Sequence, residues 1–459
     1  MLEESQNTRE ILRLAAQEPP QLLREVVDGI IRIGKSKEEV VKFSRTMNCH
    51  PHDGQYHLGK AFEERFALGG TTTHAIMGMF GPQEQKPFEL TINVGPNGET
   101  ATVPSGRFSI VGTNGGWIET SPSDNNGFPA LTIFGEVQRQ FVDDVNELID
   151  DVEARIQVDS IFRGNTLKVI LHDQFGDKLD QPIMTYVDPN DGMPFSHLVF
   201  SKDTSRRLRH YFEAFLGVEP KVKRSVALVG AYGVGKTEEL RKAASIGNSF
   251  GWTVLYAQRP QDIVEVYRLG VMYAPSVVIV EDIDRAVTNN RDDATNELMN
   301  VLDGIDTKGA PVFLVATTNH PEAIPKSVSR KGRFDVAIEI ETPDAGACEQ
   351  MLRNFCGDKL RDDEDVSDAA ETLAGRIPAE VAEVAKRAMM VASMLKQELT
   401  GDFLDIASQD LLADPRFGVK DEDDEGKLAE AIKTIGASTA LVLAAGWNID
   451  QANIRKEGL

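Results

Sequence analysis

The chain has 459 residues, 41% of them hydrophobic, and this length exceeds what one ordinary core organises, so we expect two or three domains. Its 49 basic and 72 acidic residues give a net charge of −23, which argues against nucleic acid as a broad, non-specific partner. Three cysteines make no disulfide framework, and no apolar run is long enough to cross a bilayer. The acidic N-terminus lacks an apolar signal core, so we expect a soluble, cytoplasmic protein without a membrane partner.

Residues 1–195 are predicted to form a separate α+β region that recognises a partner or substrate. Residues 1–80 carry apolar positions at helical spacing and are expected to be mainly helical. From residue 88 to 111 the pattern alternates as in a hairpin, with a turn at 94–98.

The second half of this region contains a predicted loop and a predicted helix. Residues 112–127 are rich in Gly, Ser, Asn and Pro and indicate an exposed loop. An amphipathic helix is expected over 134–156, followed by strands up to residue 186 and a boundary at 188–192.

Histidines and a cysteine gather early in the chain, at Cys49, His50, His52 and His57. Their spacing fits no common zinc pattern, so a metal site is the weaker alternative. The Asp53-Gly54 pair that follows indicates an exposed turn.

From residue 196 to 342, short apolar strands alternate with helical segments, which is typical of a parallel sheet covered by helices. The strands are expected at 226–229, 253–257, 277–280 and 312–316. Residues 343–397 and 398–459 are predicted to be helical. The fold class is therefore α/β, preceded by the α+β region.

A Gly-rich loop with the spacing G-x-x-x-x-G-K-T follows the first of these strands and leads into a helix from Lys236. The glycines let backbone N–H groups face phosphate oxygens, Lys236 neutralises phosphate charge, and Thr237 ligates Mg²⁺. The alternative, a turn that ends in Lys-Thr by chance, is disfavoured by the strand before it and the helix after it. The sequence therefore predicts an ATP and Mg²⁺ site at Gly230, Tyr232, Gly233, Val234, Gly235, Lys236, Thr237 and Glu238.

Polar residues that could take part in catalysis or metal binding follow the later strands. Glu281 and Asp282 end a buried strand, where one carboxylate can hold Mg²⁺ and the next can orient the attacking water. Asn319 ends the next strand and is placed to contact the γ-phosphate or the water. Arg330 and Arg333 carry guanidinium groups suited to the charge of a phosphoryl-transfer transition state, and a neighbouring subunit could receive them in trans.

Residues from about 200 to 397 resemble the AAA family of the AAA+ superfamily, P-loop NTPases. Besides the phosphate loop, the resemblance rests on residues 296–304, 318–321 and 332–335, and on 375–380, which are similar to the start of a helical lid. It implies a ring, usually a hexamer, that hydrolyses ATP between subunits and remodels a macromolecule. It also implies that Arg330 and Arg333 are arginine fingers, that Asn319 is a sensor, and that Gly375 of the lid contacts nucleotide.

Two departures from the family pattern bear on function. The acid pair is Glu281 then Asp282, where the usual order is Asp then Glu, and slow hydrolysis is therefore expected. The mitochondrial translocase family for the Rieske iron–sulfur protein carries a similar Glu-Asp order. Between residues 253 and 277 the chain also lacks room for the aromatic–hydrophobic–Gly loop of substrate-threading rings, and Tyr256 is expected on the strand itself.

The sequence thus predicts an ATPase that forms a homo-oligomeric ring and remodels an unidentified protein partner, without conventional threading through a pore. A nucleotide-gated scaffold with little turnover is the main alternative. A nucleic-acid motor is a further alternative, which the acidic composition disfavours.

Overall fold

The structure is a computed structural model of the chain. It describes residues 40–66, 74–78, 81–85, 88–109, 116–125, 127–192, 194–217, 223–286, 300, 309–321 and 334–413. The chain divides into two compact units, one formed by Met1–Val187 with Glu265–Ala274 and the other by Asp188–Val264 with Pro275–Leu459. The domain limits expected at residues 195, 342 and 397 remain predictions.

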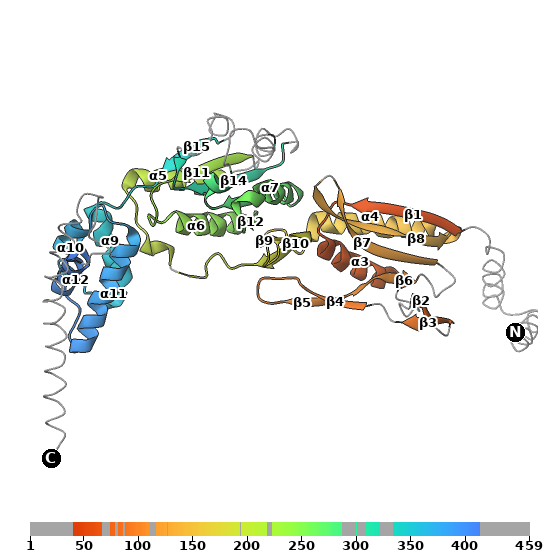
Figure 1. Cartoon of the computed structure of the whole chain (residues 1–459), viewed down its shortest axis with the longest axis horizontal. Helices are drawn as coiled ribbons and strands as arrows, with labels where there is room; N and C mark the ends of the chain where they lie inside the picture. The colour runs from red at the N-terminus through yellow and green to blue at the C-terminus, as the bar shows by residue number, and fades with distance from the viewer. Residues whose placement is uncertain are drawn as a thin grey trace, which may run out of the picture. The chain divides into compact units, whose positions relative to one another are not determined.

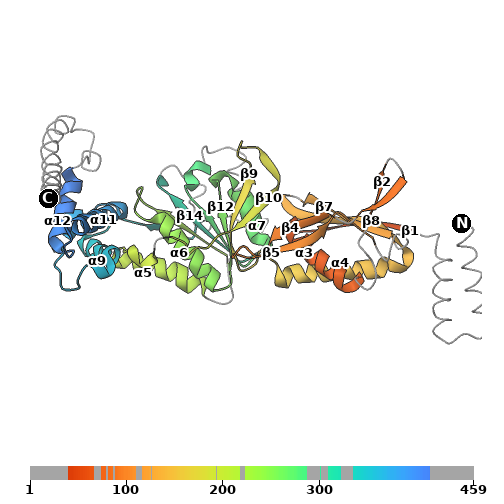
Figure 2. The ribbon, with the colours of Figure 1, turned by 90° about the horizontal axis from the view of Figure 1, so that it is seen from below.

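The first unit contains an antiparallel sheet in the order β1-β8-β7-β6, formed by β1 (Val40–Met47), β6 (Arg107–Ser109), β7 (Gly116–Asn125) and β8 (Phe128–Gln138). Helices α3 (Pro51–Phe66) and α4 (Val142–Asp159) run along one face of this sheet (Figure 2). Leu131, Ile133 and Val137 alternate along β8 and are fully buried. They form one hydrophobic core with Leu148 and Val152 of α4, so the helices and the sheet stabilise each other.

Antiparallel hairpins complete the described part of this unit. They are β2 (His74–Gly78) with β3 (Gly81–Gln85), β4 (Phe88–Asn93) with β5 (Thr100–Ser105), and β9 (Thr166–His172) with β10 (Lys178–Tyr186). In the β4–β5 hairpin the Val94 N–H donates to the Glu99 carbonyl at 2.8 Å. This confirms the hairpin predicted from residue 88 and its turn at 94–98.

Strand pairing overturns several expectations for the first unit. Residues 40–47 form β1 rather than helix, because each of them pairs with β8. Residues 116–125, expected in a loop, form β7, which is paired with β8 along its whole length and buries Ile118 completely. The helix expected over 134–156 begins only at Val142, since β8 continues to Gln138. Residues 1–39 lie outside the described residues.

The turn expected at Asp53 is also wrong, because Asp53 lies in the first turn of α3 and is completely buried. Its carboxylate accepts hydrogen bonds from the Ser160 hydroxyl at 2.6 Å and the Ile161 N–H at 3.1 Å. The Tyr273 hydroxyl and His57 Nε2 each lie 3.5 Å from it. Across the part of the chain that the structure describes, no three His, Cys, Asp or Glu side chains come together as a metal site.

His50 is buried beside this carboxylate. Its Nε2–H donates to the Pro182 carbonyl at 2.7 Å, and its Nδ1 accepts from the His52 N–H at 3.2 Å. The imidazole is therefore held neutral, and burial lowers the pKa of His50 to about 4.

Acid should therefore destabilise the first unit through His50. The unfolded chain protonates this side chain near pH 6.5 and the folded chain only near pH 4, so the free energy of unfolding falls as the pH drops through that window. One such group contributes a slope of about 1.4 kcal/mol per pH unit. We expect His50→Gln, which can keep a hydrogen bond to Pro182, to remove this part of the slope.

The measurement is urea unfolding at several pH values between about 7 and 5. Unfolding of the first unit is detected by alkylation of the buried Cys49, which mass spectrometry quantifies. The same change at exposed His52, His52→Gln, is the comparison. Because burial also lowers the pKa of His52, but less than that of His50, this variant should remove a smaller part of the slope. Equal slopes in wild type and His50→Gln would contradict the assignment.

The second unit is built on parallel strands in the order β12-β13-β14-β11-β15. These are β11 (Arg224–Val229), β12 (Thr253–Ala257), β13 (Ser276–Val280), β14 (Val312–Thr318) and β15 (Val336–Glu339). Every residue of β13 and β14 is buried, as expected for central strands with helices on both faces. Helices α5 (Lys202–Arg209) and α6 (Lys236–Ser249) lie on one face (Figure 2), and the predicted α/β class is confirmed.

Four further helices of this unit form a separate bundle, drawn in blue in Figure 1: α9 (Ala345–Cys356), α10 (Ser367–Leu373), α11 (Pro378–Leu395) and α12 (Gly401–Ala413). They share a core of their own that includes Met351, Leu352, Leu373 and Val384. The helical character predicted after residue 343 is confirmed, while residues 414–459 lie outside the described residues. None of the helices that the structure describes is both long and apolar enough to cross a bilayer.

Candidate nucleotide-binding site

The Gly-rich loop leaves the carboxyl end of β11 and enters α6 at Lys236. Gly233 and Gly235 have φ angles of 77° and 100°, which lie in the left-handed region that favours glycine. Gly230 also has to be small, since a Cβ there would lie 2.4 Å from the Ile340 carbonyl oxygen. The loop therefore leads directly to a helix N-terminus, whose free N–H groups and dipole suit an anion.

Lys236 is buried beneath this loop, with 7% of its surface exposed. Its ammonium donates to the carbonyls of Gly230 and Ala231 at 2.8 and 2.6 Å. Burial lowers the pKa of Lys236, and the carboxylates of Asp282 and Asp284 act in the opposite direction. The loop thus holds one positive charge close to where phosphate would lie.

Thr237, the residue after Lys236, contacts Glu281 at the end of β13. The Thr237 hydroxyl donates to Glu281 Oε2 at 3.0 Å, and both side chains are exposed. A hydroxyl and a carboxylate oxygen are ligands that Mg²⁺ accepts, and Mg²⁺ commonly takes its remaining ligands from water and substrate phosphates. This donor set fits the predicted Mg²⁺.

Asp282 follows Glu281 and is held in an unusual backbone conformation, with φ of 49°. Such a conformation costs about 1–2 kcal/mol for a residue with a Cβ, although Asp tolerates it better than most. Its N–H donates to the Thr317 hydroxyl at 3.1 Å, and its carbonyl accepts from the Arg285 N–H at 2.9 Å. Asn319 Nδ2 donates to Asp282 Oδ1 at 2.9 Å, and the Arg285 guanidinium lies 3.1 Å from Oδ2. Two contacts therefore fix the backbone of Asp282, and two more fix its carboxylate.

A second chain of hydrogen bonds joins the strand ends to the phosphate loop. The Thr318 hydroxyl donates to Asp284 at 2.7 Å and accepts from the His320 N–H at 2.9 Å. The Tyr232 hydroxyl lies 3.2 Å from His320 Nε2, which links the tip of the loop to the end of β14. No specific role was predicted for Thr317, Asp284 or Arg285 from the sequence, although all lie in or beside the polar runs that follow apolar stretches.

A cleft of about 360 Å³ opens beside the loop. Gly233, Gly235 and Glu238 form one wall, and Leu198 lies between them and the helical bundle. The bundle contributes the residues Phe355, Pro378, Ala379, Ala382, Glu383 and Lys386. Pro378 and Ala379 lie in the stretch 375–380 that resembles the start of a lid, whereas Leu198 and the other bundle residues were not singled out from the sequence. Their contribution depends on how the bundle folds back on the loop.

The bundle packs against residues 196–197 and against the phosphate loop. His197 stacks edge-on against Phe355 with ring centroids 4.9 Å apart, and Asn354 Nδ2 donates to the Ser196 carbonyl at 2.5 Å. Ile377, just before α11, packs so closely that a Cβ on Gly233 would lie 2.8 Å from its Cδ1.

Other predicted site residues are placed less directly. The side chain of Val234 is buried in the core around the sheet, so only its backbone can serve a ligand. Gly375, with φ of 78°, donates its N–H to the Pro343 carbonyl at 2.9 Å and is not among the residues that line the cleft. Tyr256 lies on β12, as expected, and Arg330 and Arg333 lie outside the described residues.

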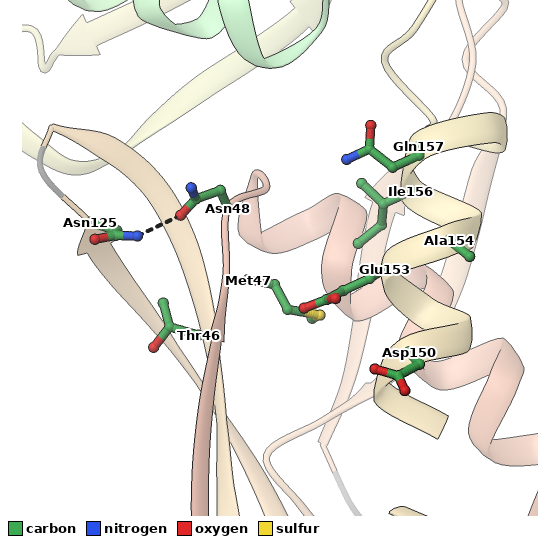
Figure 3. A pocket seen from close by; sticks show the side chains of 9 residues that line it. All are labelled: Thr46, Met47, Asn48, Asn125, Asp150, Glu153, Ala154, Ile156 and Gln157. Atoms are coloured by element: carbon green, nitrogen blue, oxygen red, sulfur yellow. Dashed lines mark hydrogen bonds between the residues drawn. The ribbon is translucent and has the colours of Figure 1, made fainter. Parts of the chain in front are cut away.

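A second cavity, of about 560 Å³, lies in the first unit between the ends of β1 and β7 and helix α4 (Figure 3). At its rim Asn125 Nδ2 donates to Asn48 Oδ1 at 2.8 Å. Its carboxylates, Asp150 and Glu153, both pair with Arg45, at 2.7 and 2.8 Å. Because Arg45 already neutralises much of their charge, we assign no ligand to this cavity.

A phosphate loop between a parallel strand and a helix, acids at the end of a buried strand, and a helical bundle facing the loop define a P-loop nucleotide-binding domain with a lid. Residues 226–342 match the family described as ATPase family associated with various cellular activities (AAA). The nucleotide-binding domain of this chain is thus similar to that family over residues 226–342.

Several curated proteins are similar over the same part of the chain. Protein SAV of Sulfolobus acidocaldarius is 31% identical over 194 residues, 39% of this chain and 24% of its own. ATP-dependent zinc metalloprotease FtsH of Helicobacter pylori is 28% identical over 211 residues, 41% of this chain and 33% of its own. Protein CdcH of Halobacterium salinarum is 27% identical over 280 residues, 55% of this chain and 36% of its own. The chain thus spans about a quarter to a third of these relatives.

The contact between Gly233 and Ile377 gives a test of the site. We expect Gly233→Ala to weaken ATP binding at least about tenfold, from left-handed backbone strain together with the clash at Ile377 Cδ1. Ile377→Val removes that one atom, so the double variant Gly233→Ala/Ile377→Val should recover part of the loss. Calorimetric titration with ATP measures both.

Gly375→Ala is the matched control, because Gly375 has nearly the same φ but open space around it. It should weaken ATP binding by about threefold or less, from backbone strain alone. Equal binding by wild type and Gly233→Ala would refute the close approach of lid and loop.

Proposed function

We propose that this protein binds and hydrolyses ATP with Mg²⁺, assembles into a homo-oligomeric ring, and uses the cycle to remodel a protein partner. The proposal rests mainly on one observation: the two neighbouring carboxylates contact different partners. Glu281 is joined to Thr237, and Asp282 is joined to Asn319. One carboxylate thus belongs to the metal side of the site and the other to the side of the attacking water.

The phosphate end of the site follows from the residues already described. Mg²⁺, held by Thr237 and Glu281, would supply positive charge at the β- and γ-phosphates when ATP is bound. Lys236 would exchange its bonds to the loop carbonyls for bonds to phosphate oxygens, so that its buried charge meets an anion. Asn319 would hold Asp282 in place while that carboxylate orients a water molecule in line with the γ-phosphate.

The cleft beside the loop suits the rest of the nucleotide. Its volume of about 360 Å³ falls within the range of small-molecule sites, and Leu198, Phe355 and Pro378 give it an apolar lining for a base. Because α11 contributes to this cleft, bound nucleotide would contact both the phosphate loop and the lid. Such shared contacts are what allow a ligand to bias the relative position of two rigid parts.

Assembly and partner choice rest on resemblance and on the relatives. Arg330 and Arg333 are proposed to reach the nucleotide of a neighbouring subunit, as arginine fingers do in trans. The region before residue 195 is proposed to select the partner, with a cytoplasmic location. The short connection from Ala257 to Pro260, and the position of Tyr256 on β12, support a mode of action without conventional pore threading.

A nucleotide-gated scaffold with little turnover is the second candidate. One observation favours it: both carboxylate oxygens of Asp282 are already engaged, by Asn319 and Arg285. The carboxylate is also one methylene shorter than the usual glutamate. A scaffold would assemble on ATP and release its partners slowly, without needing fast hydrolysis.

Ring formation with shared sites predicts that ATP turnover per subunit rises with protein concentration. Arg333→Ala should lower the rate at high concentration by about a hundredfold or more, because trans arginines contribute about 10³–10⁵ in related enzymes. Arg206→Ala removes an exposed arginine of α5 that pairs with nearby Asp203 and should leave the rate within about twofold. A specific activity that is independent of concentration and of Arg333 would exclude shared sites.

The order Glu281 then Asp282 predicts that the shorter side chain of Asp282 limits the rate of the hydrolysis step. Exchanging the two residues by Glu281→Asp with Asp282→Glu should raise kcat by about tenfold, since misplacement of order 1 Å can cost about a hundredfold. Single-turnover hydrolysis with saturating ATP measures this step. Asp282→Asn should abolish hydrolysis and keep ATP binding. A double variant slower than wild type would show that the surrounding contacts are adapted to the native order.

A further inference from the structure

The lid carries apolar side chains on α11 and α12 that stay exposed within the part of the chain that the structure describes. On α11, Met390, Val391, Met394 and Leu395 are 56%, 41%, 75% and 49% exposed, and on α12 Ile406 is 59% exposed. The four α11 residues recur at helical spacing and share one side of the helix. We call these five residues the lid patch.

A neighbouring side of α11 is apolar too. Val384, Ala385, Ala388 and Ala392 are buried in the core of the lid. The apolar surface of this helix is therefore wider than the lid core covers, and exposed methionine and leucine clusters bury readily against other apolar surface. The lid patch is thus a candidate contact surface.

The chain itself continues from the end of α12 at Ala413 with residues 414–459. In this sequence, residues 435–449 (IGASTALVLAAGWNI) contain no Asp, Glu, Lys or Arg and are mostly apolar. An uncharged segment of this composition is poorly suited to full exposure to water. It is thus a second apolar part of the chain, joined to the lid through residues 414–434.

We infer that residues 435–449 dock onto the lid patch of the same chain. The connection from Ala413 to residue 435 can extend over several tens of ångströms, since each residue spans about 3.3–3.6 Å, and α12 packs directly on α11. A tether of this length gives the segment a high effective concentration at the patch, which favours it over a separate molecule.

Charge supports the same occupant. The connecting stretch contains the acidic run 421–425 (DEDDE). Lys396, which ends α11 beside the patch, is exposed and has no ion pair with any residue that the structure describes. An acidic run that passes this lysine on the way to the patch would gain a favourable, salt-sensitive interaction.

The test is limited trypsin cleavage of the full-length protein at Lys433, beside the docked segment, read by mass spectrometry. In wild type we expect protection of this bond and slow amide hydrogen exchange in 435–449 at all protein concentrations. The double variant Met390→Asp/Met394→Asp should speed cleavage and exchange at least about tenfold. Val158→Asp, at an 86% exposed valine of α4, is the matched control and should behave as wild type.

Each other outcome overturns the proposal. Equal cleavage in all three proteins would mean that the segment does not occupy the patch. Protection that appears only as protein concentration rises would mean that a second copy supplies the cover. Continued hydrogen-exchange protection of Val384 and Ala385 in the double variant confirms that the lid has folded. The readouts use no ATP turnover, so they succeed or fail independently of the proposed function.

Discussion

The parallel packing of β11, β14 and β13 is the constraint on which the candidate site depends. β14 lies between the other two strands, and the register sets Val229 opposite Thr318 and Val280 opposite Ala316. All three strands therefore end at one edge of the sheet. The phosphate loop, the acid pair and Asn319 leave the sheet there, although they are far apart in the sequence. An antiparallel strand in the middle would have sent Asn319 to the opposite edge.

The two units differ in how far their structure could be predicted. In the second unit, short apolar runs bounded by turn residues predicted β11, β12, β13 and β14 close to their observed limits, because these strands are largely buried on both faces and need no alternation. The edge strand β15, which is mostly not buried, was not predicted. In the first unit, β7 has Gly, Ser, Pro and Asn along much of its length, and only its pairing with β8 makes it a strand. Local propensity does not report pairing between distant segments, and β1 was missed for the same reason, since it is a strand only by its pairing with β8.

Several side-chain environments could likewise not be predicted from the sequence. The positive φ of Asp282 and its bond to Thr317 depend on how two neighbouring strands end, which no spacing rule reports. Asp53 looked like a turn residue, yet it is buried because Ser160 and Ile161, more than a hundred residues later, supply its donors. Motif spacing predicted residue types well where the chemistry is local to one loop, as at Lys236 and Thr237. It could not predict partners brought in by tertiary packing.

The close approach of Gly233 and Ile377 has a consequence for how such sequences can diverge. The two positions lie in different subdomains, yet the space between them leaves room for only one side chain. A side chain at position 233 is opposed both by the positive φ of Gly233 and by Ile377, so a smaller residue at 377 would remove one of these two obstacles. The lid and the phosphate loop are thus expected to evolve as a pair, so that a lid transplanted from a distant relative would have to bring its own loop.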